Sequence, residues 1–323
     1  MIGASGTQSA SVADPLRQPA IESRIRAIAC RCAEAVAPHG SSIDHVAFPC
    51  IRNPRLVNPA RTWVPPPFSR LPLRFDVDAL RGALALLPSD AWRPHFNTGY
   101  YEGDWSGIAL RAHDDAFTPL APGQGEARPT AHCDAFWQAQ LARLDTALHS
   151  ARLLRLGPGG RIREHRDYDL GGDDGDLRIH VPIVTDERVD FLLDGRKVPM
   201  QAGECWFLDL SRPHRVENHG GLARIHLVVD CARSPWIEAQ IDAGLADTPP
   251  SQPSRGSEAF AAFRAHVHAH PALEDELATL TDTEAFLDAV LASASEAGFG
   301  FEREEVRVAM AQARRDWVRQ WRA

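Results

Sequence analysis

The sequence lacks the features that mark several common classes of partner. It contains no run of about 18 apolar residues, the length that a membrane-spanning helix needs, and its first residues lack the charged start and apolar stretch of an export signal. A net charge of −8 and the absence of a basic run argue against a nucleic-acid partner. We therefore expect a cytoplasmic protein that binds neither membranes nor nucleic acids.

Paired cysteines are also missing, although the chain has six cysteines. None stands in a Cys-x-x-Cys pair or at a spacing typical of zinc ligands, so we expect reduced cysteines that pack inside the protein. At 323 residues and 44% hydrophobic content, the chain is long enough for a full core and one or two domains.

Two histidines and an aspartate in the second half of the chain are suited to binding iron. A non-haem Fe(II) centre that activates O2 needs its ligands on one face, and two imidazoles with one carboxylate provide this. His165 and Asp167 are two residues apart, so on an extended strand both side chains leave from the same side. His214 begins another probable strand, and we expect it to complete the triad from across a barrel.

Arg224 follows His214 by ten residues and suggests a second ligand. The segment from Ala223 to Asp230 alternates, which places Arg224, His226 and Val228 on one face of a strand. A guanidinium group that faces inward suits a carboxylate, here that of a dicarboxylate cosubstrate.

The His-x-Asp pattern occurs three times, so most copies need another explanation. One pair begins at His113, and a second, His132 with Asp134, opens an amphipathic helix where Asp134 is better interpreted as a cap. Only the third pair lies among short strands and has a histidine and an arginine downstream. For that reason we assign the metal to the pair that begins at His165.

Short strands separated by turns fill the chain from Ala151 to Asp230, which is typical of an antiparallel barrel or a double-sheet jelly roll. Within the strand expected at Leu177 to Thr185, Arg178 and His180 share a face. They either line the iron pocket and hold a carboxylate of cosubstrate or substrate, or they point to solvent.

These motifs resemble the aspartyl/asparaginyl β-hydroxylase family, which includes bacterial free-proline hydroxylases. The resemblance runs from about Trp92 to Asp230 and is carried by Trp92-Arg93-Pro94-His95-Phe96-Asn97, Tyr101-Glu102-Gly103-Asp104-Trp105, His165-Arg166-Asp167, Arg178-Ile179-His180, and His214 with Arg224. It implies a mainly β catalytic core, a double-stranded β-helix (jelly roll, cupin-like), with flanking helices and an all-α C-terminal region.

The same resemblance implies Fe(II), 2-oxoglutarate and O2 as the reactants that the protein brings together. Fe(II) would be held by His165, Asp167 and His214, and the distal carboxylate of 2-oxoglutarate by Arg224. His180 would lie near the other end of 2-oxoglutarate, with Arg178 as a further cofactor-binding residue. Animal members of the family have glycine where Asp167 stands, so this chain looks more like the bacterial branch.

By this resemblance we expect a dioxygenase that hydroxylates a carbon of an amino acid, free or within a peptide. Desaturation or another oxidation by the same kind of enzyme is an alternative, and so is an inactive metal- or peptide-binding module. The segment from Trp92 to Arg111 mixes aromatic and polar groups, and its candidates for substrate contact are His95, Asn97, Trp105 and Arg111. Aromatic residues on a strand also pack a core, so that interpretation stands beside the first.

We divide the chain into residues 1–67 (a tail, a helix at about 15–37 and an irregular proline-rich segment), the dioxygenase domain 68–232, a linker 233–256 and a helical domain 257–323. The helical domain is similar to a leader-like domain found in nitrogen-fixation-associated proteins and in some peptide precursors. This likeness implies a precursor peptide as a possible partner. The alternative is a helical cap on the barrel.

Overall fold

The computed structural model describes residues 63–123, 125–170 and 175–320. The chain divides into two compact units, one of Arg55–Ser254 and one that includes Arg255–Ala323, and each is described by itself below. The helix expected at about 15–37 lies outside the described residues, as does most of segment 1–67.

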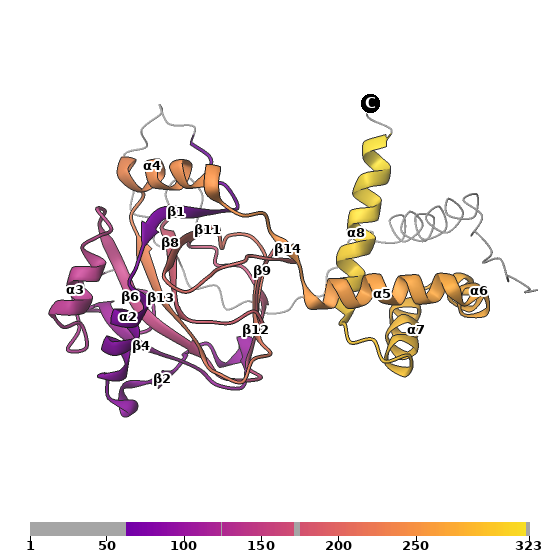
Figure 1. The fold of residues 1–323 in the computed structure, drawn as a ribbon, viewed down its shortest axis with the longest axis horizontal. Helices are drawn as coiled ribbons and strands as arrows, with labels where there is room; N and C mark the ends of the chain where they lie inside the picture. The colour runs from indigo at the N-terminus through magenta and orange to yellow at the C-terminus, as the bar shows by residue number, and fades with distance from the viewer. Residues whose placement is uncertain (1–62, 124, 171–174, 321–323) are drawn as a thin grey trace, which may run out of the picture. The chain divides into compact units, whose positions relative to one another are not determined.

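The first unit is built from two antiparallel sheets (Figure 1). The larger sheet has the order β1-β11-β8-β13-β6-β4-β2, with β5 paired to β4, and the smaller has the order β14-β10-β9-β12-β7-β3. The larger sheet contains β1 (Phe68–Arg74), β2 (Arg93–Pro94), β4 (Trp105–His113), β5 (Ala127–Pro129), β6 (Leu148–Leu156), β8 (Leu177–Val184), β11 (Glu204–Leu208) and β13 (Arg224–Cys231). The smaller contains β3 (Tyr101–Glu102), β7 (Arg161–His165), β9 (Val189–Leu193), β10 (Arg196–Lys197), β12 (His214–Asn218) and β14 (Gln252–Pro253).

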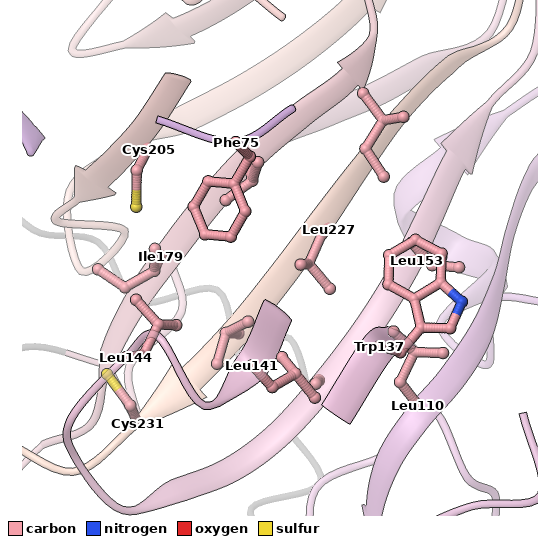
Figure 2. Close-up of a cluster of buried hydrophobic side chains, with 14 of the residues drawn as sticks. Phe75, Leu110, Trp137, Leu141, Leu144, Leu153, Ile179, Cys205, Leu227 and Cys231 are labelled. Atoms are coloured by element: carbon pink, nitrogen blue, oxygen red, sulfur yellow. The ribbon is translucent and has the colours of Figure 1, made fainter. Parts of the chain in front are cut away.

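The larger sheet is apolar on its outer face, where three helices cover it. These are α2 (Val77–Ala85), α3 (Ala135–Leu141) and α4 (Pro235–Gly244). Figure 2 shows Trp137 and Leu141 of α3 in one buried cluster with Leu153 of β6 and Leu227 of β13. Because side chains alternate along a strand, the residues between these apolar positions face inward, toward the smaller sheet. A second apolar cluster, which includes Phe191 and Trp206, fills much of the space on that side.

Two helices of the first unit begin at aspartates whose side chains act as caps. The carboxylate of Asp76 accepts from the backbone N–H groups of Asp78 and Ala79, and that of Asp134 accepts from Trp137. Each bond satisfies a donor that the first turn of a helix leaves free. The predicted role of Asp134 is therefore confirmed, and the second His-x-Asp pair is explained without a metal.

The segments around the barrel differ from the sequence-based expectations at three places. The proline-rich stretch, which we expected to be irregular, continues past residue 67 to Pro72, and Pro72 lies in strand β1, which pairs with β11 at the edge of the larger sheet. Proline cannot donate to a neighbouring strand but is tolerated at an edge, and the register breaks beside Pro72, between Leu71 and Arg74. The expected linker 233–256 contains α4, whose Ile237 and Ile241 belong to the outer cluster. The apolar residues of Val198–Met200 also predict a strand, but the strand lies earlier, as β10.

Short 3₁₀ turns complete this unit at Ser89–Ala91, Thr98–Tyr100 and Leu245–Asp247. The expected fold, a mainly β double-stranded β-helix with flanking helices, is confirmed. The described part of the second unit is all-α, with α5 (Arg255–Ala269), α6 (Pro271–Thr279), α7 (Thr283–Glu296) and α8 (Arg303–Gln320) around its own core of Phe263, Leu277, Leu287, Val290, Ala294 and Val306. Within the described ranges, no helix has the length and apolar content needed to cross a membrane.

Candidate metal and cosubstrate site

His165, Asp167 and His214 lie together on the smaller sheet. Each offers one ligand atom, and these atoms all lie within 4.8 Å of one another. His165 ends β7 and is the direct cross-strand partner of His214, the first residue of β12. The expectation that His214 approaches from across a barrel is therefore wrong, because the two histidines stand on neighbouring strands. Asp167 lies just beyond β7, where its backbone N–H donates to the carbonyl oxygen of Leu210 at 2.9 Å.

Both imidazoles are held so that the same nitrogen is free. Nδ1 of His165 lies 2.8 Å from the carbonyl oxygen of Arg163, and Nδ1 of His214 lies 3.0 Å from that of Arg212. A carbonyl oxygen only accepts, so each Nδ1 donates its proton, which leaves Nε2 of each ring as the atom that can bind a metal. Burial, together with the neighbouring His165, lowers the pKa of His214 to about 4, which keeps it neutral near pH 7.

Arg178, on the inner face of β8, lies between two carboxylates. Its Nη1 donates to Oδ2 of Asp167 at 2.5 Å, and its Nε donates to Oδ1 of Asp230 at 2.6 Å. Burial alone would lower the pKa of Arg178, but Asp230 and Asp167 outweigh it and raise that pKa above its ordinary value. Arg178 therefore faces the site rather than solvent, and three of its nitrogens are already bonded.

Arg224, on β13, differs from Arg178 because none of the described carboxylates pairs with it. Its side chain is buried, and its one hydrogen bond runs from Nη2 to Nδ1 of His226 at 2.8 Å. The Nε atom has no partner among the described residues. Burial lowers the pKa of Arg224 to about 9, since none of the described carboxylates lies against it to favour the charge. A buried guanidinium without a carboxylate is costly, so this geometry is suited to an anionic ligand.

Phe191 of β9 connects Arg224 to the metal-binding cluster. Its ring stacks on His214 at 6.3 Å between centroids, meets His180 edge-on at 5.4 Å, and lies 5.7 Å from the guanidinium carbon of Arg224. His180 and His226 are both buried, their Nδ1 atoms lie 3.4 Å apart, and each has an Nε2 without a partner in the described chain. Polar groups that need a partner thus extend from the triad to Arg224.

Three of the four predicted substrate residues lie beside this cluster. His95 is buried, and its ring stacks on Trp105 at 3.5 Å and on Phe96 at 4.5 Å. Asn97 donates its backbone N–H to Nδ1 of His95 at 3.3 Å. Burial lowers the pKa of His95 to about 3, with further contributions from the nearby Arg152 and Arg178. Trp105 also belongs to the inner apolar cluster, so both interpretations of this aromatic residue apply.

Arg111 is not brought to the triad. Its Nε donates to the carbonyl oxygen of Leu148 at 2.9 Å, and it lines a cavity of ≈ 380 Å³ beside helix α3. The strand that carries it explains the difference. β4 is irregular between Ala109 and Arg111, so the alternation that directs Trp105 inward does not continue to Arg111.

The other histidine and carboxylate groups have different surroundings. Nδ1 of His113 bonds to the carbonyl oxygen of Gly125 at 2.8 Å. A second set of possible ligands, Asp190 with Glu217 and His219, is already flanked by cations, as Lys197 lies 2.7 Å from Asp190. Within the described ranges, only the cluster of His165, Asp167 and His214 combines two imidazoles with one carboxylate.

The sequence interpretation missed several residues that complete the site. Asp230 and Arg152, both on the inner face of the larger sheet, form an ion pair beside Arg178. His226 supports Arg224, and Phe191 joins the two halves of the site. Alternation in Ala223 to Asp230 had placed Arg224 and His226 on one face. The cross-strand partners could not be found that way, because their register is set by distant segments.

Part of the chain is similar to known proteins. Residues 82–234 match the family model described as aspartyl/asparaginyl beta-hydroxylase, a range that contains the triad and Arg224. Among curated proteins, the L-proline cis-4-hydroxylase of Rhizobium meliloti (strain 1021) is 28% identical over 94 residues, which cover 29% of this chain and 33% of the relative. The chain thus spans about a third of the length of this relative.

Solved structures offer more distant likenesses. A Pseudomonas putida prolyl-4-hydroxylase is 20% identical with a TM-score of 0.34, and the match covers 52% of this chain and 93% of that one. A Burkholderia pseudomallei oxidoreductase of the 2OG-Fe(II) oxygenase family is 13% identical with a TM-score of 0.35, covering 49% of this chain and 79% of the other.

Proposed function

We propose that this chain is an Fe(II)- and 2-oxoglutarate-dependent dioxygenase that hydroxylates a carbon of an amino acid, free or within a peptide. One observation carries the proposal: two imidazoles, each with its Nδ1 bonded to a backbone carbonyl, converge with a carboxylate, and a buried arginine without a carboxylate partner among the described residues lies one phenyl ring away. The family model and the proline hydroxylase relative support the reaction class.

The donor set fits Fe(II). Both imidazoles are fixed with Nδ1 protonated and Nε2 available, and the carboxylate oxygen Oδ1 of Asp167 lies 3.7 Å from Nε2 of His165. The two imidazole nitrogens and one carboxylate oxygen form the set used by non-haem iron oxygenases, and such a set leaves coordination positions for a cosubstrate. His165, Asp167 and His214 would hold the metal.

The surroundings of Arg224 fit the distal carboxylate of 2-oxoglutarate. A dicarboxylate would give the buried guanidinium the negative charge that the described residues do not supply. The Nε2 atoms of His180 and His226, which lack partners, offer further hydrogen bonds to a polar ligand along the same face. Arg224 and His180 would bind the cosubstrate, and His226 would hold Arg224 in place.

The protein's part in the reaction is to bind, orient and shield the reactants. Fe(II) with 2-oxoglutarate supplies the oxidising chemistry that turns O2 and a C–H bond into a hydroxylated product, succinate and CO2. Arg224 would hold one end of the cosubstrate, and the ring of Phe191, which packs between Arg224 and His214, would exclude water there. His95 and Trp105 line the neighbouring position, where we place the substrate.

Turnover tests this proposal most simply. The protein is incubated with Fe(II), 2-oxoglutarate, O2 and a panel of free amino acids and peptides, and both succinate and the mass of the product are followed. Gain of one oxygen atom with matching succinate supports hydroxylation, whereas loss of two hydrogen atoms indicates the alternative desaturation. Tight metal binding without succinate from any substrate would favour an inactive binding module.

The helical unit of α5–α8 has its own apolar core, and two predicted roles apply to it. A leader-like role would direct the enzyme to a precursor peptide, whereas a structural role would not affect substrate choice. The test compares turnover of one amino acid in two forms, as the free amino acid and as a residue of a leader-bearing peptide. A strong preference for the leader-bearing peptide supports the first.

A further inference from the structure

We infer that Arg178 is a positioning residue that makes Asp167 a one-oxygen metal ligand, and that Asp230 supports it from behind. This inference rests on the function proposed above. It differs from the expectation that Arg178 binds the cosubstrate, and it assigns a role to Asp230, which the sequence interpretation did not include.

The two oxygens of Asp167 have different surroundings. Oδ1 is on the side of the histidines, 3.7 Å from Nε2 of His165, whereas Oδ2 accepts from Nη1 of Arg178 at 2.5 Å. A carboxylate can bind a metal through one oxygen or through both. Because Oδ2 is directed to the guanidinium group while Oδ1 is on the side of the histidines, we expect Oδ1 alone to bind the metal, which leaves a coordination position free for other ligands.

Arg178 itself is fixed from the opposite side. Its Nε and Nη2 donate to the two oxygens of Asp230 at 2.6 and 3.1 Å, which is the two-point geometry that a guanidinium and a carboxylate favour. Arg178 on β8 and Asp230 on β13 are direct cross-strand partners, so the sheet register sets their separation. The position of Asp167 is therefore tied to the rigid larger sheet.

Further contacts hold Asp230. Its Oδ2 accepts from Oγ of Ser150 at 2.9 Å and from Nη2 of Arg152. Burial alone would raise the pKa of Asp230, but Arg152 and Arg178 lower it far below its ordinary value, so Asp230 stays charged. The four groups alternate in sign from Arg152 through Asp230 and Arg178 to Asp167. Such a network is costly to interrupt, because each loss leaves a buried charge without its partner.

This arrangement separates the roles of the two inner-face arginines. All three nitrogens of Arg178 have carboxylate partners, so a free anion would have to displace one of them. Arg224 has no such partner among the described residues. We therefore assign the ligand to Arg224 and the orientation of Asp167 to Arg178.

The test measures metal binding rather than turnover. Co(II) is titrated into the metal-free full chain and into the variants Arg178→Met, Arg178→Lys and Asp230→Asn, and both the Kd and the visible spectrum are recorded. Removing groups that orient metal ligands typically weakens affinity by about 10- to 100-fold, which we expect for Arg178→Met. Arg178→Lys should recover part of this loss, because it keeps the charge.

The Co(II) spectrum and a double-mutant cycle distinguish positioning from a general structural role. The spectrum reports coordination number, and we expect it to change in Arg178→Met, where Asp167 is free to bind through both oxygens. If Asp230 acts through Arg178, the double variant Arg178→Met/Asp230→Asn should lose no more affinity for Co(II) than Arg178→Met alone. Arg155→Lys is the matched control, since Arg155 pairs with Asp104 rather than with the cluster, and it should behave as wild type.

Other outcomes would overturn the inference. An unchanged Kd and spectrum in Arg178→Met, with a higher requirement for 2-oxoglutarate or substrate, would make Arg178 a ligand-binding residue. Additive losses in the double variant would show that Asp230 acts independently. Should Arg178→Met fail to fold, Arg178→Lys and Asp230→Asn carry the same comparison. A wild-type chain that binds no metal would instead refute the proposed function.

Discussion

Replacement of Arg224 by methionine should make the metal-free protein more stable while it abolishes cosubstrate binding. The charged form of Arg224 is disfavoured by burial, which lowers its pKa to about 9. At about 1.4 kcal/mol per pH unit, keeping this group charged at pH 7 destabilises the ligand-free fold by a few kcal/mol. This destabilisation is complete below pH 9, where Arg224 is charged in the folded protein, and it disappears as the pH rises toward the ordinary pKa of arginine.

Methionine keeps much of the volume of the side chain and removes the charge. Part of the gain is offset by the lost bond to His226 and by imperfect packing, on the order of 1 kcal/mol each. The shift of the pKa of Arg224 from 12.5 to about 9 corresponds to about 5 kcal/mol, so about 3 kcal/mol remain, which would raise the Tm by about 6–12 °C in a domain of this size. Loss of the guanidinium partner should weaken 2-oxoglutarate binding by at least ~30-fold, because such pairs are worth about 2–5 kcal/mol.

Thermal unfolding of the metal-free protein and calorimetric titration of 2-oxoglutarate into the Mn(II)-loaded protein measure the two effects. Arg155→Met serves as the control, since Arg155 is partly exposed and paired with Asp104. A lower Tm for Arg224→Met together with unchanged 2-oxoglutarate affinity would refute the reasoning, because Arg224 would then be a structural residue with a partner of its own.

Three further predictions concern individual side chains. His226→Phe removes the acceptor for Arg224 and should weaken 2-oxoglutarate binding by about 10-fold or more without changing the metal Kd; calorimetry that finds the metal affinity reduced instead would contradict this. His95→Phe should raise the KM for substrate, whereas Arg111→Met, which changes a residue beside α3, should not; the opposite order in steady-state kinetics would reverse our assignment. Asp134→Ala removes a helix cap and should lower the free energy of unfolding in urea by ~1 kcal/mol, while metal binding is unchanged. If the variant no longer binds the metal, the second His-x-Asp pair would again be a candidate for the metal site.

Local patterns in the sequence were sufficient for the inward face of one strand beside the site and for the starts of two helices. The alternation in Ala223 to Asp230 gives the inward face of β13 correctly, with Arg224 and His226 on the side opposite Leu227. Asp76 and Asp134 mark helix starts because capping depends on residues only two or three positions away.

Relations between distant segments were harder to predict. The pairing of His214 with His165, and of Arg178 with Asp230, depends on sheet order and register, which no local pattern records. Strand β1 was missed because Pro72 and the prolines before the strand indicate irregular chain, and only its place at a sheet edge makes Pro72 acceptable. Arg111 was misplaced because an irregularity in β4 interrupts the alternation.

The dependence of 2-oxoglutarate binding on metal tests the central claim most directly. Calorimetric titration compares metal-free and Mn(II)-loaded wild-type protein with Asp167→Ala treated in the same way. We predict that 2-oxoglutarate binds tightly to the loaded wild type only, and that it strengthens Mn(II) binding by the same factor, as thermodynamic linkage requires. Equal binding of 2-oxoglutarate with and without metal, or unaltered Mn(II) binding by Asp167→Ala, would contradict a shared site formed by the triad and Arg224.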